Sequence, residues 1–501
     1  MLEKVQQDRL NKLQRIRDLG VDPYGSKYET AQPIAKILDG YQDETEGQTA
    51  DAAGRLILFR DMGKMIFAHI RDQSGQMQVA FRKNAMSETE FQLAKLLDLG
   101  DVIACSGPLQ KSRTGEITIW AEKLTFLTKS LLPMPEKFHG LRDIELRSRQ
   151  RYLDLMTNPE SMQRFSKRLA IIEHFRRTLM DRGFSEVETP MLQPIYGGAA
   201  ARPFTTHHNA LDMLLYMRIS PETYLKRLLV GGMEKVFEIN RNFRNEGVDA
   251  SHNPEFTMME LYQAYADYTD MMEITETLVS TAAEAVCGST KVQWGELELD
   301  FATPWRRAEY GDLLKEHAGV DMFDIPAVRE KARRLGIEEK GKDDAVVVNL
   351  VFEETVEQHL VQPMFVLNYP AAICPLTRRH PDDDRIALRF EAFAANMELA
   401  NAYTELNDPE IQLENFSAQV AGEDDETMRV MDEDFILALQ HGMPPAGGLG
   451  VGVDRIVMLL TDTQNIRDVI LFPLMRPLGG RDSDQAAGDE DDQALAGEEA
   501  N

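Results

Sequence analysis

The chain has 501 residues, of which 43% are hydrophobic and 28% charged, enough for the cores of two to four domains of roughly 100–200 residues each. No run of about 18 apolar residues occurs, which argues against a membrane-spanning helix, and the first residues lack the apolar core of a secretory signal. Three cysteines lie far apart, match no zinc spacing and favour the reducing cytoplasm as the location.

The formal net charge of −28 is unevenly distributed along the chain. Residues 1–150 carry 22 basic and 21 acidic side chains, whereas the other 351 residues carry 33 and 62. Net charge alone argues against a nucleic-acid partner, but a near-neutral N-terminal third can still meet a polyanion. The alternative, that the acidity only aids solubility, stays open at this point.

Residues 1–40 are predicted to form an N-terminal helical extension. Apolar side chains recur every three residues, with basic side chains between them: Leu10, Leu13, Ile16 and Leu19, and Arg9, Lys12, Arg15 and Arg17. Gly20 and the pair Asp22–Pro23 then end the helix. Its basic face can add contacts to nucleic-acid phosphates.

Residues 41–130 change character and predict a small β-barrel. Turn signals such as Ser74–Gly75 and Thr114–Gly115 separate short runs of strand-forming residues: Leu56–Phe59, Ile66–Ile70, Gln76–Phe81, Val102–Cys105, Ile117–Trp120 and Leu124–Leu127. So many short strands in about 75 residues indicate a barrel of the OB type. A generic β-sandwich remains an alternative, because periodicity alone does not separate the two folds.

The remaining sequence divides into a linker, a large domain and a tail. Two prolines in close succession mark residues 131–150 as a linker. Residues 151–480 mix long helices with long strands, such as Met162–Arg182 and Lys235–Arg244. Residues 481–501 hold eight acidic side chains and few apolar ones, so we expect an acidic disordered tail.

Three separated segments carry the side chains suited to chemistry. The first, Gly183–Leu192, is a helix end that runs into a strand with a proline. In the second, Phe243–Tyr262, two strands joined by a polar loop place charged groups at one end of a sheet. The third, Gly447–Arg455, has glycines that let a backbone approach a ligand closely, and its arginine opens an apolar helix. This third segment lacks both the dinucleotide fingerprint and the P-loop lysine.

In this order the three segments resemble motifs 1, 2 and 3 of the class II aminoacyl-tRNA synthetases. An OB-type domain before the catalytic part is similar to the subclass of lysine, aspartate and asparagine enzymes. Further runs resemble the lysyl-tRNA synthetases in particular: Lys137–Leu141, Arg149–Asp154, Gly197–Phe204, Ser220–Arg227 and Asn401–Asp408. The resemblance implies an α+β fold, with an OB-type β-barrel followed by a class II catalytic domain built on an antiparallel sheet flanked by helices.

The resemblance also implies an ATP site, and the residue types suit that ligand. Arg244 is a permanent cation suited to the α-phosphate, Phe256 offers a flat face to adenine, and Glu246 can accept from the adenine amino group. His252 and Asn253 would lie in the loop over the triphosphate. Arg455 would be a second catalytic arginine, near the γ-phosphate. For Arg244, a solvated ion pair at a strand end remains the alternative.

The triphosphate also needs a metal, and the resemblance assigns Mg²⁺ to Glu391 and Glu398. In a hairpin that turns near Ala394–Ala395, the two carboxylates would face each other. Paired hard oxygens suit Mg²⁺ that is shared with phosphate oxygens. The alternative is one exposed glutamate on each strand, without a metal.

The charge of the pocket predicts the amino acid substrate. A lysine ammonium needs carboxylates and hydroxyls around it, whereas an aspartate side chain needs a cation. Carboxylates from three separate segments, Glu222, Glu260 and Glu405, therefore favour lysine. The resemblance places Glu222 and Glu260 near the α-amino group, and Glu405 with Tyr262 at the ε-ammonium. The other pocket residues would be Gly198, Asn401 and Tyr403.

The barrel is predicted to bind the tRNA anticodon. Phe67 can stack on a base, and Gln78 and Glu116 can hydrogen-bond to base edges. All three match the family's positions for a uridine-rich anticodon. For Phe67 by itself, a place in the barrel core is an equal alternative.

The predicted function is ATP-dependent activation of L-lysine, followed by its transfer to the 3′ end of tRNA(Lys). The first motif of the family forms much of a two-fold interface, so Gly183–Leu192 predicts a homodimer with Pro190 near the axis. One alternative is an aspartyl- or asparaginyl-tRNA synthetase, which the acidic pocket disfavours. Another is a nucleic-acid-binding module on a catalytically inactive synthetase fold. The presence of all four residues expected for catalysis and metal binding argues against it: Arg244, Arg455, Glu391 and Glu398.

Overall fold

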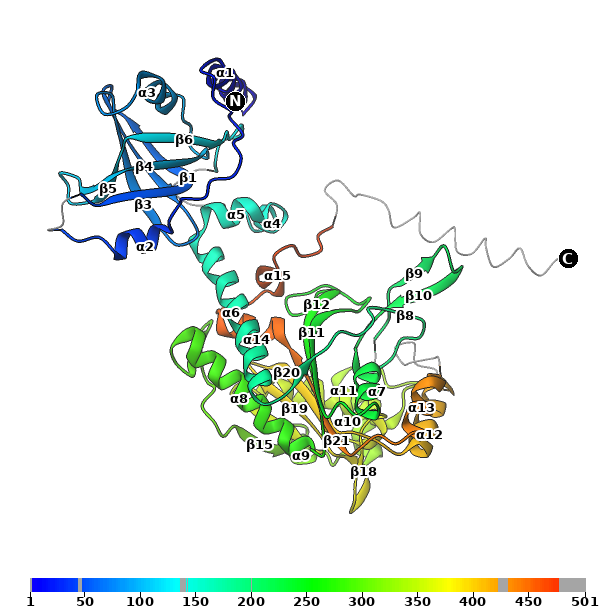
Figure 1. Cartoon of the computed structure of the whole chain (residues 1–501). Coiled ribbons are helices and arrows are strands. Elements are labelled where there is room, and N and C mark those ends of the chain that lie inside the picture. Colours follow the sequence, from blue (N-terminus) through cyan, green and yellow to red (C-terminus); the bar gives the residue numbers. More distant parts are fainter. Residues whose placement is uncertain are drawn as a thin grey trace. The chain divides into compact units, whose positions relative to one another are not determined.

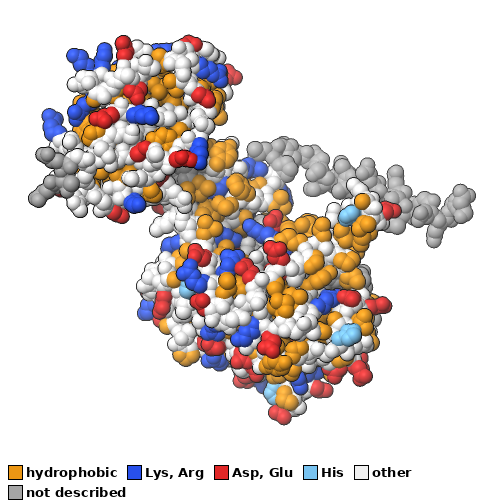
Figure 2. Space-filling model, in the orientation of Figure 1, with side chains coloured by type: hydrophobic (Ala, Val, Ile, Leu, Met, Phe, Trp, Pro, Cys, Tyr) orange, Lys and Arg blue, Asp and Glu red, His pale blue; other side chains and the backbone are white. Residues whose placement is uncertain are grey.

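The computed structural model describes residues 2–43, 47–135, 141, 143–199, 201–421 and 431–476 (Figure 1). The predicted acidic tail at 481–501 and the run 137–140 of the predicted linker lie outside the described residues. The chain forms two compact units, Met1–Arg142 and Asp143–Asn501, and each is described by itself. Among the described helices, none has the length and apolar character needed to cross a membrane. Acidic and basic side chains are interspersed over the visible faces of both units (Figure 2).

Unit 1 is a closed β-barrel with helices packed on it. Its elements are α1 (Leu2–Asp18), α2 (Ile34–Asp39), β1 (Thr49–Asp61), β2 (Met65–Arg71), β3 (Gln76–Arg82), α3 (Glu88–Lys95), β4 (Val102–Lys111), β5 (Ile117–Ala121) and β6 (Lys123–Thr128). The strands pair in the order β1-β2-β3-β5-β4, a pairing of β1 with β4 closes the ring, and β6 also pairs with β4. The predicted OB-type barrel is therefore confirmed, and the sandwich alternative is wrong.

Alternation along β2 sorts its side chains between the inside and the outside of the barrel. Ile66, Ala68 and Ile70 are fully buried in the barrel core. Phe67 and His69 occupy the alternate positions and are only partly buried, because successive side chains of a strand point to opposite faces. The Phe67 ring therefore lies on the outer face of the barrel, which removes the main argument for a core role.

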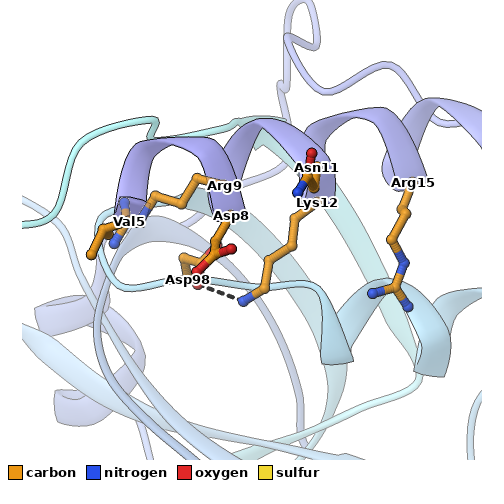
Figure 3. Close-up of a pocket in the computed structure, with 7 residues that line it drawn as sticks. All are labelled: Val5, Asp8, Arg9, Asn11, Lys12, Arg15 and Asp98. Carbon is orange, nitrogen blue, oxygen red and sulfur yellow. Dashed lines mark hydrogen bonds and ion pairs between the residues drawn. The ribbon is translucent and has the colours of Figure 1, made fainter. Parts of the chain in front are cut away.

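Helix α1 is held on the barrel by its own basic side chains, which corrects part of the sequence interpretation. Arg9 is only 6% exposed, and its guanidinium donates to the backbone carbonyls of Leu99, Ser130 and Leu132. The ammonium of Lys12 lies 2.6 Å from a carboxylate oxygen of Asp98, beside a cleft of about 450 Å³ (Figure 3). Both cations bind groups of unit 1 itself. Of the four basic side chains, Arg15 and Arg17 are exposed and remain the candidates for contacts to phosphates.

Unit 2 is built on an eight-stranded sheet in the order β15-β16-β19-β20-β21-β12-β11-β7. These strands are β7 (Ser185–Glu186), β11 (Lys235–Phe243), β12 (Glu255–Ala264), β15 (Arg306–Glu309), β16 (Met364–Leu367), β19 (Arg389–Ala394), β20 (Met397–Thr404) and β21 (Ala446–Gly452). The pairs β15–β16 and β11–β7 are parallel and the others antiparallel. The predicted antiparallel sheet is thus confirmed for its centre, with a parallel pair at each edge.

Smaller strands and the helices complete unit 2. The remaining strands are β8 (Leu192–Gln193), β9 (Thr205–His208), β10 (Met213–Met217), β13 (Lys291–Trp294), β14 (Leu297–Asp300), β17 (Arg379–His380) and β18 (Asp383–Ala387). The α-helices are α4 (Ile144–Arg149), α5 (Arg151–Thr157), α6 (Pro159–Asp181), α7 (Glu222–Val230), α8 (Tyr268–Cys287), α9 (Tyr310–Ala318), α10 (Ile325–Leu335), α11 (Asp344–Thr355), α12 (Pro409–Ala421), α13 (Glu433–Gln440), α14 (Val453–Leu460) and α15 (Ile466–Val469). Short 3₁₀ turns are η1 (Glu357–His359) and η2 (Ala371–Ile373).

Helices α6, α8 and α14 cover one face of the large sheet. Buried residues of α6, α8 and α14, such as Phe175, Leu278 and Val457, pack with Leu261 and Val451 of the sheet in one core. In a strand the neighbouring positions point the other way. The residues that alternate with this core therefore lie together on the opposite face, and they include most of the predicted substrate-binding side chains.

Candidate active site

Strand pairing sets the candidate residues in two rows across the sheet. One row runs from Glu260 through Gly450 and Asn401 to Glu391, on four neighbouring strands. The next row runs through Tyr262, Gly448, Tyr403 and Arg389. Because paired residues share a face, these side chains lie on either side of the glycines of β21, which form the floor between them.

The glycines of β21 are required by their neighbours rather than by their own backbone angles. A Cβ atom at Gly448 would lie 2.5 Å from the Tyr262 ring and would also clash with a carboxylate oxygen of Glu405. A Cβ atom at Gly450 would lie 2.7 Å from the Met258 methyl group. The glycine-rich third segment therefore makes room for side chains of the adjacent strands, and not only for a ligand.

Three buried glutamates come together above this floor, as predicted. Glu222 opens α7, Glu260 lies on β12, and Glu405 directly follows β20; each is at most 4% exposed. Tyr403 donates to Glu222 over 2.7 Å, and Tyr262 donates to Glu260 over 3.0 Å. Carboxylates and hydroxyls from three segments thus form one buried acidic cluster, the arrangement that an ammonium group requires.

Burial strongly affects the protonation of this cluster. Burial and the nearby charge of Glu222 raise the pKa of Glu260 to about 7, although hydrogen bonds from Ser220 and Tyr262 favour its ionised form. Burial also raises the pKa of Glu405, while Lys226 acts in the opposite direction. A positive charge that entered the cluster would favour the ionised form of each carboxylate.

Gly198 lies against the same cluster, where the sequence places it. Its φ of +87° is in the left-handed region that favours glycine. A Cβ atom there would lie 2.9 Å from the Ser220 hydroxyl and 3.0 Å from the Cβ of Glu222. A side chain at this position would therefore push on the carboxylate at the start of α7.

The predicted adenine and phosphate contacts lie at the end of the β11–β12 pair. The Arg244 guanidinium carbon lies 5.1 Å from the centre of the Phe256 ring, a cation–π contact that orients both groups. Asn253 is buried and donates to the carbonyl of Glu255, which leaves its own side-chain oxygen without a partner. Glu246 is exposed in the loop between the strands.

The structure joins the loop of the second segment to the helix of the third. One nitrogen of Arg455 donates to Nε2 of His252 over 3.1 Å, and the other donates to the carbonyl of Glu398 over 2.7 Å. Because Nε2 accepts, the ring proton lies on Nδ1, which donates to Asp249 over 2.8 Å. Arg455 thus contacts both His252, which was predicted for the triphosphate, and Glu398, which was predicted for the metal.

The predicted carboxylate pair is close together but not placed as the hairpin argument expected. The turn falls at Ala395–Asn396, both with positive φ, and a register shift follows Ala392. As a result Glu398 lies opposite Phe393, and Glu391 lies opposite Asn401. The direct facing of the two carboxylates was therefore wrong, because an irregular pairing displaces one strand by a residue.

The Glu391 carboxylate is nevertheless in electrostatic contact with Glu398. Burial raises the pKa of Glu391 to about 7, and the charge of Glu398 adds to the rise, whereas Arg389 opposes it. Arg389 and the Tyr369 hydroxyl donate to Glu391 over 2.5 and 2.8 Å. Within the part of the chain that the structure describes, no group of three or more His, Cys, Asp or Glu is placed to hold a metal ion.

The outer face of the barrel brings the predicted anticodon residues together. Gln78 donates to Glu116 over 2.7 Å and accepts from the Thr118 hydroxyl, and His69 lies 2.6 Å from the other Glu116 oxygen. Phe67 lies two residues before His69 on β2, and its ring is in edge contact with Trp120, with the ring centres 6.2 Å apart. A ring and a hydrogen-bonding group therefore lie next to each other, as base recognition requires.

A comparison with protein families identifies what these two units are. A family model described as "tRNA synthetases class II (D, K and N)" matches residues 143–476. The chain belongs to this family. A second model, described as "OB-fold nucleic acid binding domain", matches residues 52–127 of the synthetase, within unit 1.

Relatives named "Lysine--tRNA ligase" match the synthetase over nearly its whole length. The protein from Pelotomaculum thermopropionicum is 52% identical over 486 residues, which cover 95% of this chain and 96% of the relative. The proteins from Carboxydothermus hydrogenoformans and Staphylococcus aureus are each 50% identical, over 475 and 482 residues, which cover 94% and 93% of this chain and 97% of each relative. The resemblance read from the sequence is thus confirmed for both units.

Sequence reasoning missed several residues of the synthetase that the structure brings to the site. Lys226 lies among the buried glutamates, and Arg389 links Glu391 with Asn401. The spacing of four residues from Glu222 to Lys226 on a helix was a signal for an ion pair that could have revealed the first. Two further carboxylates lie near the metal position. The charge of Glu353 adds to the raised pKa of Glu391. Burial, together with the charges of Glu353, Glu391 and Glu398, raises the pKa of Glu357 to about 8.

Proposed function

We propose that this synthetase is a lysine–tRNA ligase, which activates L-lysine with ATP and transfers it to tRNA(Lys). The observation that carries the proposal is the buried cluster of Glu222, Glu260 and Glu405, on the sheet face opposite α6, α8 and α14. Three carboxylates would repel an aspartate side chain, and an asparagine amide has no charge to offset theirs, whereas an ammonium group does. The relatives named "Lysine--tRNA ligase" point in the same direction.

The chemistry follows from position and charge, without a protein nucleophile. A carboxylate oxygen of lysine attacks the α-phosphorus of ATP, and pyrophosphate leaves. The terminal ribose hydroxyl of tRNA later attacks the activated carbonyl carbon, loses its proton, and AMP leaves. Arg244 neutralises charge on the α-phosphate, and Phe256 supports the adenine ring. Arg455 and His252, already in contact, would hold the far phosphates.

Mg²⁺ fits the residues at the metal position as a co-ligand of the triphosphate. Glu391 and Glu398 offer hard oxygen donors, and a carboxylate with a pKa of about 7 gains stability when a cation replaces its proton. Two protein carboxylates suit an ion that takes its other ligands from phosphate and water. When bound, Mg²⁺ would offset charge on the phosphates; Arg389 would hold the Glu391 side chain in place.

The deciding experiment is ATP–pyrophosphate exchange with each of the twenty amino acids, one at a time. Exchange that depends on lysine, with no more than background for aspartate and asparagine, is the expected result. Exchange with aspartate or asparagine would place the protein elsewhere in the subclass. Tight tRNA binding with no exchange for any amino acid would favour the binding-module alternative.

A variant on the outer face of the barrel tests whether tRNA binding and lysine activation depend on different units. Phe67→Ala should weaken tRNA charging, because a base stack is worth about 1–3 kcal/mol, while lysine-dependent exchange stays unchanged. Charging is measured with saturating ATP and a range of tRNA concentrations. Phe59→Ala, at a partly buried position packed on the barrel core, is the control for damage to the fold. Equal loss of charging and exchange in the Phe67 variant would contradict its role in base binding.

The first motif gives a prediction about assembly. We propose a homodimer with Gly183–Leu192 in the interface and Pro190 near the two-fold axis. Sedimentation at micromolar protein should give about twice the chain mass. A fully active monomer at that concentration would contradict the proposal.

Glu260 gives a prediction about pH. With a pKa of about 7, it loses its proton as the pH rises from 6 to 8, and the pocket becomes more negative. The value of kcat/KM for lysine should therefore rise over this range, and the Glu260→Gln variant should lack this rise. Exchange is measured at saturating ATP and limiting lysine. The same pH dependence in both proteins would show that another group titrates.

A further inference from the structure

A buried lysine of the chain itself lies inside the acidic cluster. The Lys226 side chain is fully buried on α7, one turn after Glu222. Its ammonium lies 2.6 Å from a Glu222 oxygen and is also ion-paired with Glu405. The ring of Tyr403 lies 5.5 Å away. A cation is thus built into the place where a substrate cation is expected to bind.

This lysine stays charged in its buried position. Burial disfavours an ammonium, but the charges of Glu222 and Glu405 outweigh this effect and raise the pKa of Lys226 above its usual value. The Tyr403 ring of β20 also lies against it, and Glu260 and Tyr262 of β12 interact with Glu222 and Glu405 in the same cluster. The nearby cations Arg218 and Arg389 are paired with other carboxylates, Glu238 and Glu391.

The charge balance shows what the lysine contributes. With all three cluster glutamates ionised, their charge is −3, and Lys226 brings the sum to −2. The lysyl group of an aminoacyl adenylate carries two ammonium groups and no free carboxylate, because its carboxyl group is joined to the α-phosphate as a mixed anhydride. Pocket and ligand charges then cancel, which is favourable for groups removed from water.

The ion pairs also fix the positions of the carboxylates. Lys226 holds one oxygen of Glu222, and the Tyr403 hydroxyl donates to the other. It joins Glu222 on a helix to Glu405 after a strand, so two carboxylates from separate elements share one cation. Without this cation, two buried like charges would repel each other, and one of them would take up a proton.

We propose that Lys226 is a positioning residue for substrate recognition, an internal cation that holds Glu222 and Glu405 ready for the substrate's ammonium groups. The proposal rests on the proposed function, because it assumes that lysine binds at the acidic cluster. It predicts that Lys226 stays in place when the substrate binds and does not compete with it.

The test compares Lys226→Met with a matched variant, Lys129→Met. Lys129 is equally buried and is also paired with two carboxylates, Asp98 and Asp101, but it belongs to unit 1. Lysine-dependent ATP–pyrophosphate exchange is measured from pH 6.5 to 9, together with lysine binding by calorimetry. Lys226→Met should raise the KM for lysine at least about tenfold at neutral pH, with the KM for ATP unchanged.

The pH profile separates a positioning role from a merely structural one. In Lys226→Met the carboxylates lose the cation that lowers their proton affinity, so they hold a proton to higher pH. The kcat/KM for lysine should therefore rise more steeply between pH 7 and 9 than in the wild type. Lys129→Met should keep the wild-type profile.

Several outcomes would overturn the proposal. A lower KM for lysine in Lys226→Met would show that the side chain competes with the substrate. An unchanged KM and pH profile would show that it does not contribute. Lys226→Gln, which keeps a polar end, is the second variant, and failure of both variants to fold would assign Lys226 a structural role only. If the wild type does not activate lysine, the proposed function itself fails, independently of these results.

Discussion

Glu405→Gln should lower lysine activation by roughly two to three orders of magnitude, since removing one partner of a buried ion pair costs about 3–5 kcal/mol and 1.4 kcal/mol is about tenfold. The Glu405 side chain is only 1% exposed, and its charge is shared with Lys226 on α7. Glutamine keeps the shape, which matters because a Cβ atom at Gly448 would already clash with this side chain. The variant therefore removes charge with little change in packing.

Substrate kinetics separate this effect from general damage. The KM for ATP should barely change, because Arg244, Phe256 and Arg455 are untouched. Glu276→Gln is the matched control, a buried glutamate of α8 that accepts from the Trp305 backbone N–H outside the pocket. Wild-type lysine kinetics in the Glu405 variant would place the ammonium elsewhere, and Glu260 would become the candidate.

Asp454→Asn should lower the free energy of unfolding of unit 2 by about 3–5 kcal/mol, because it leaves a buried arginine without its countercharge. Asp454 lies in the first turn of α14, and its two oxygens accept from Arg168 of α6 and from the backbone N–H of Thr257 over 2.5 and 2.7 Å. Arg168 also donates to the carbonyl of Val469. One ion pair thus links α6, β12, α14 and α15.

The measurement is urea unfolding followed by tryptophan fluorescence. A Trp120→Phe background leaves Trp294 and Trp305, both in unit 2, as the fluorescent reporters. The control is Glu173→Gln, which breaks an exposed ion pair with Arg177 on α6 and should change stability by at most about 1 kcal/mol. Similar losses in both variants would mean that the Asp454 pair is no more important than a surface pair.

The sequence predicted the elements correctly where local patterns have a single physical meaning. The six short runs between residues 56 and 127 all lie in strands, because alternation and turn residues are local signals. Helix α6 was expected at Met162–Arg182 and is found at Pro159–Asp181, with Gly183 at a positive φ after its end. Motif resemblance then identified the family, which the match to residues 143–476 confirms.

The sequence by itself also brought together Glu222, Glu260 and Glu405 as one pocket, through residue chemistry and resemblance. It did not reveal Lys226 as their common partner, because the pairing with Glu405 joins segments about 180 residues apart in the chain. It placed Glu391 opposite Glu398, but left-handed residues at Ala395–Asn396 and a register shift moved the pairing. It predicted phosphate contacts for the basic face of the first helix, whereas the hydrogen bonds of Arg9 go to three backbone carbonyls of unit 1. Strand identity and helix ends follow from local sequence, whereas the partner of a buried charge depends on which distant segments the fold brings within reach of it.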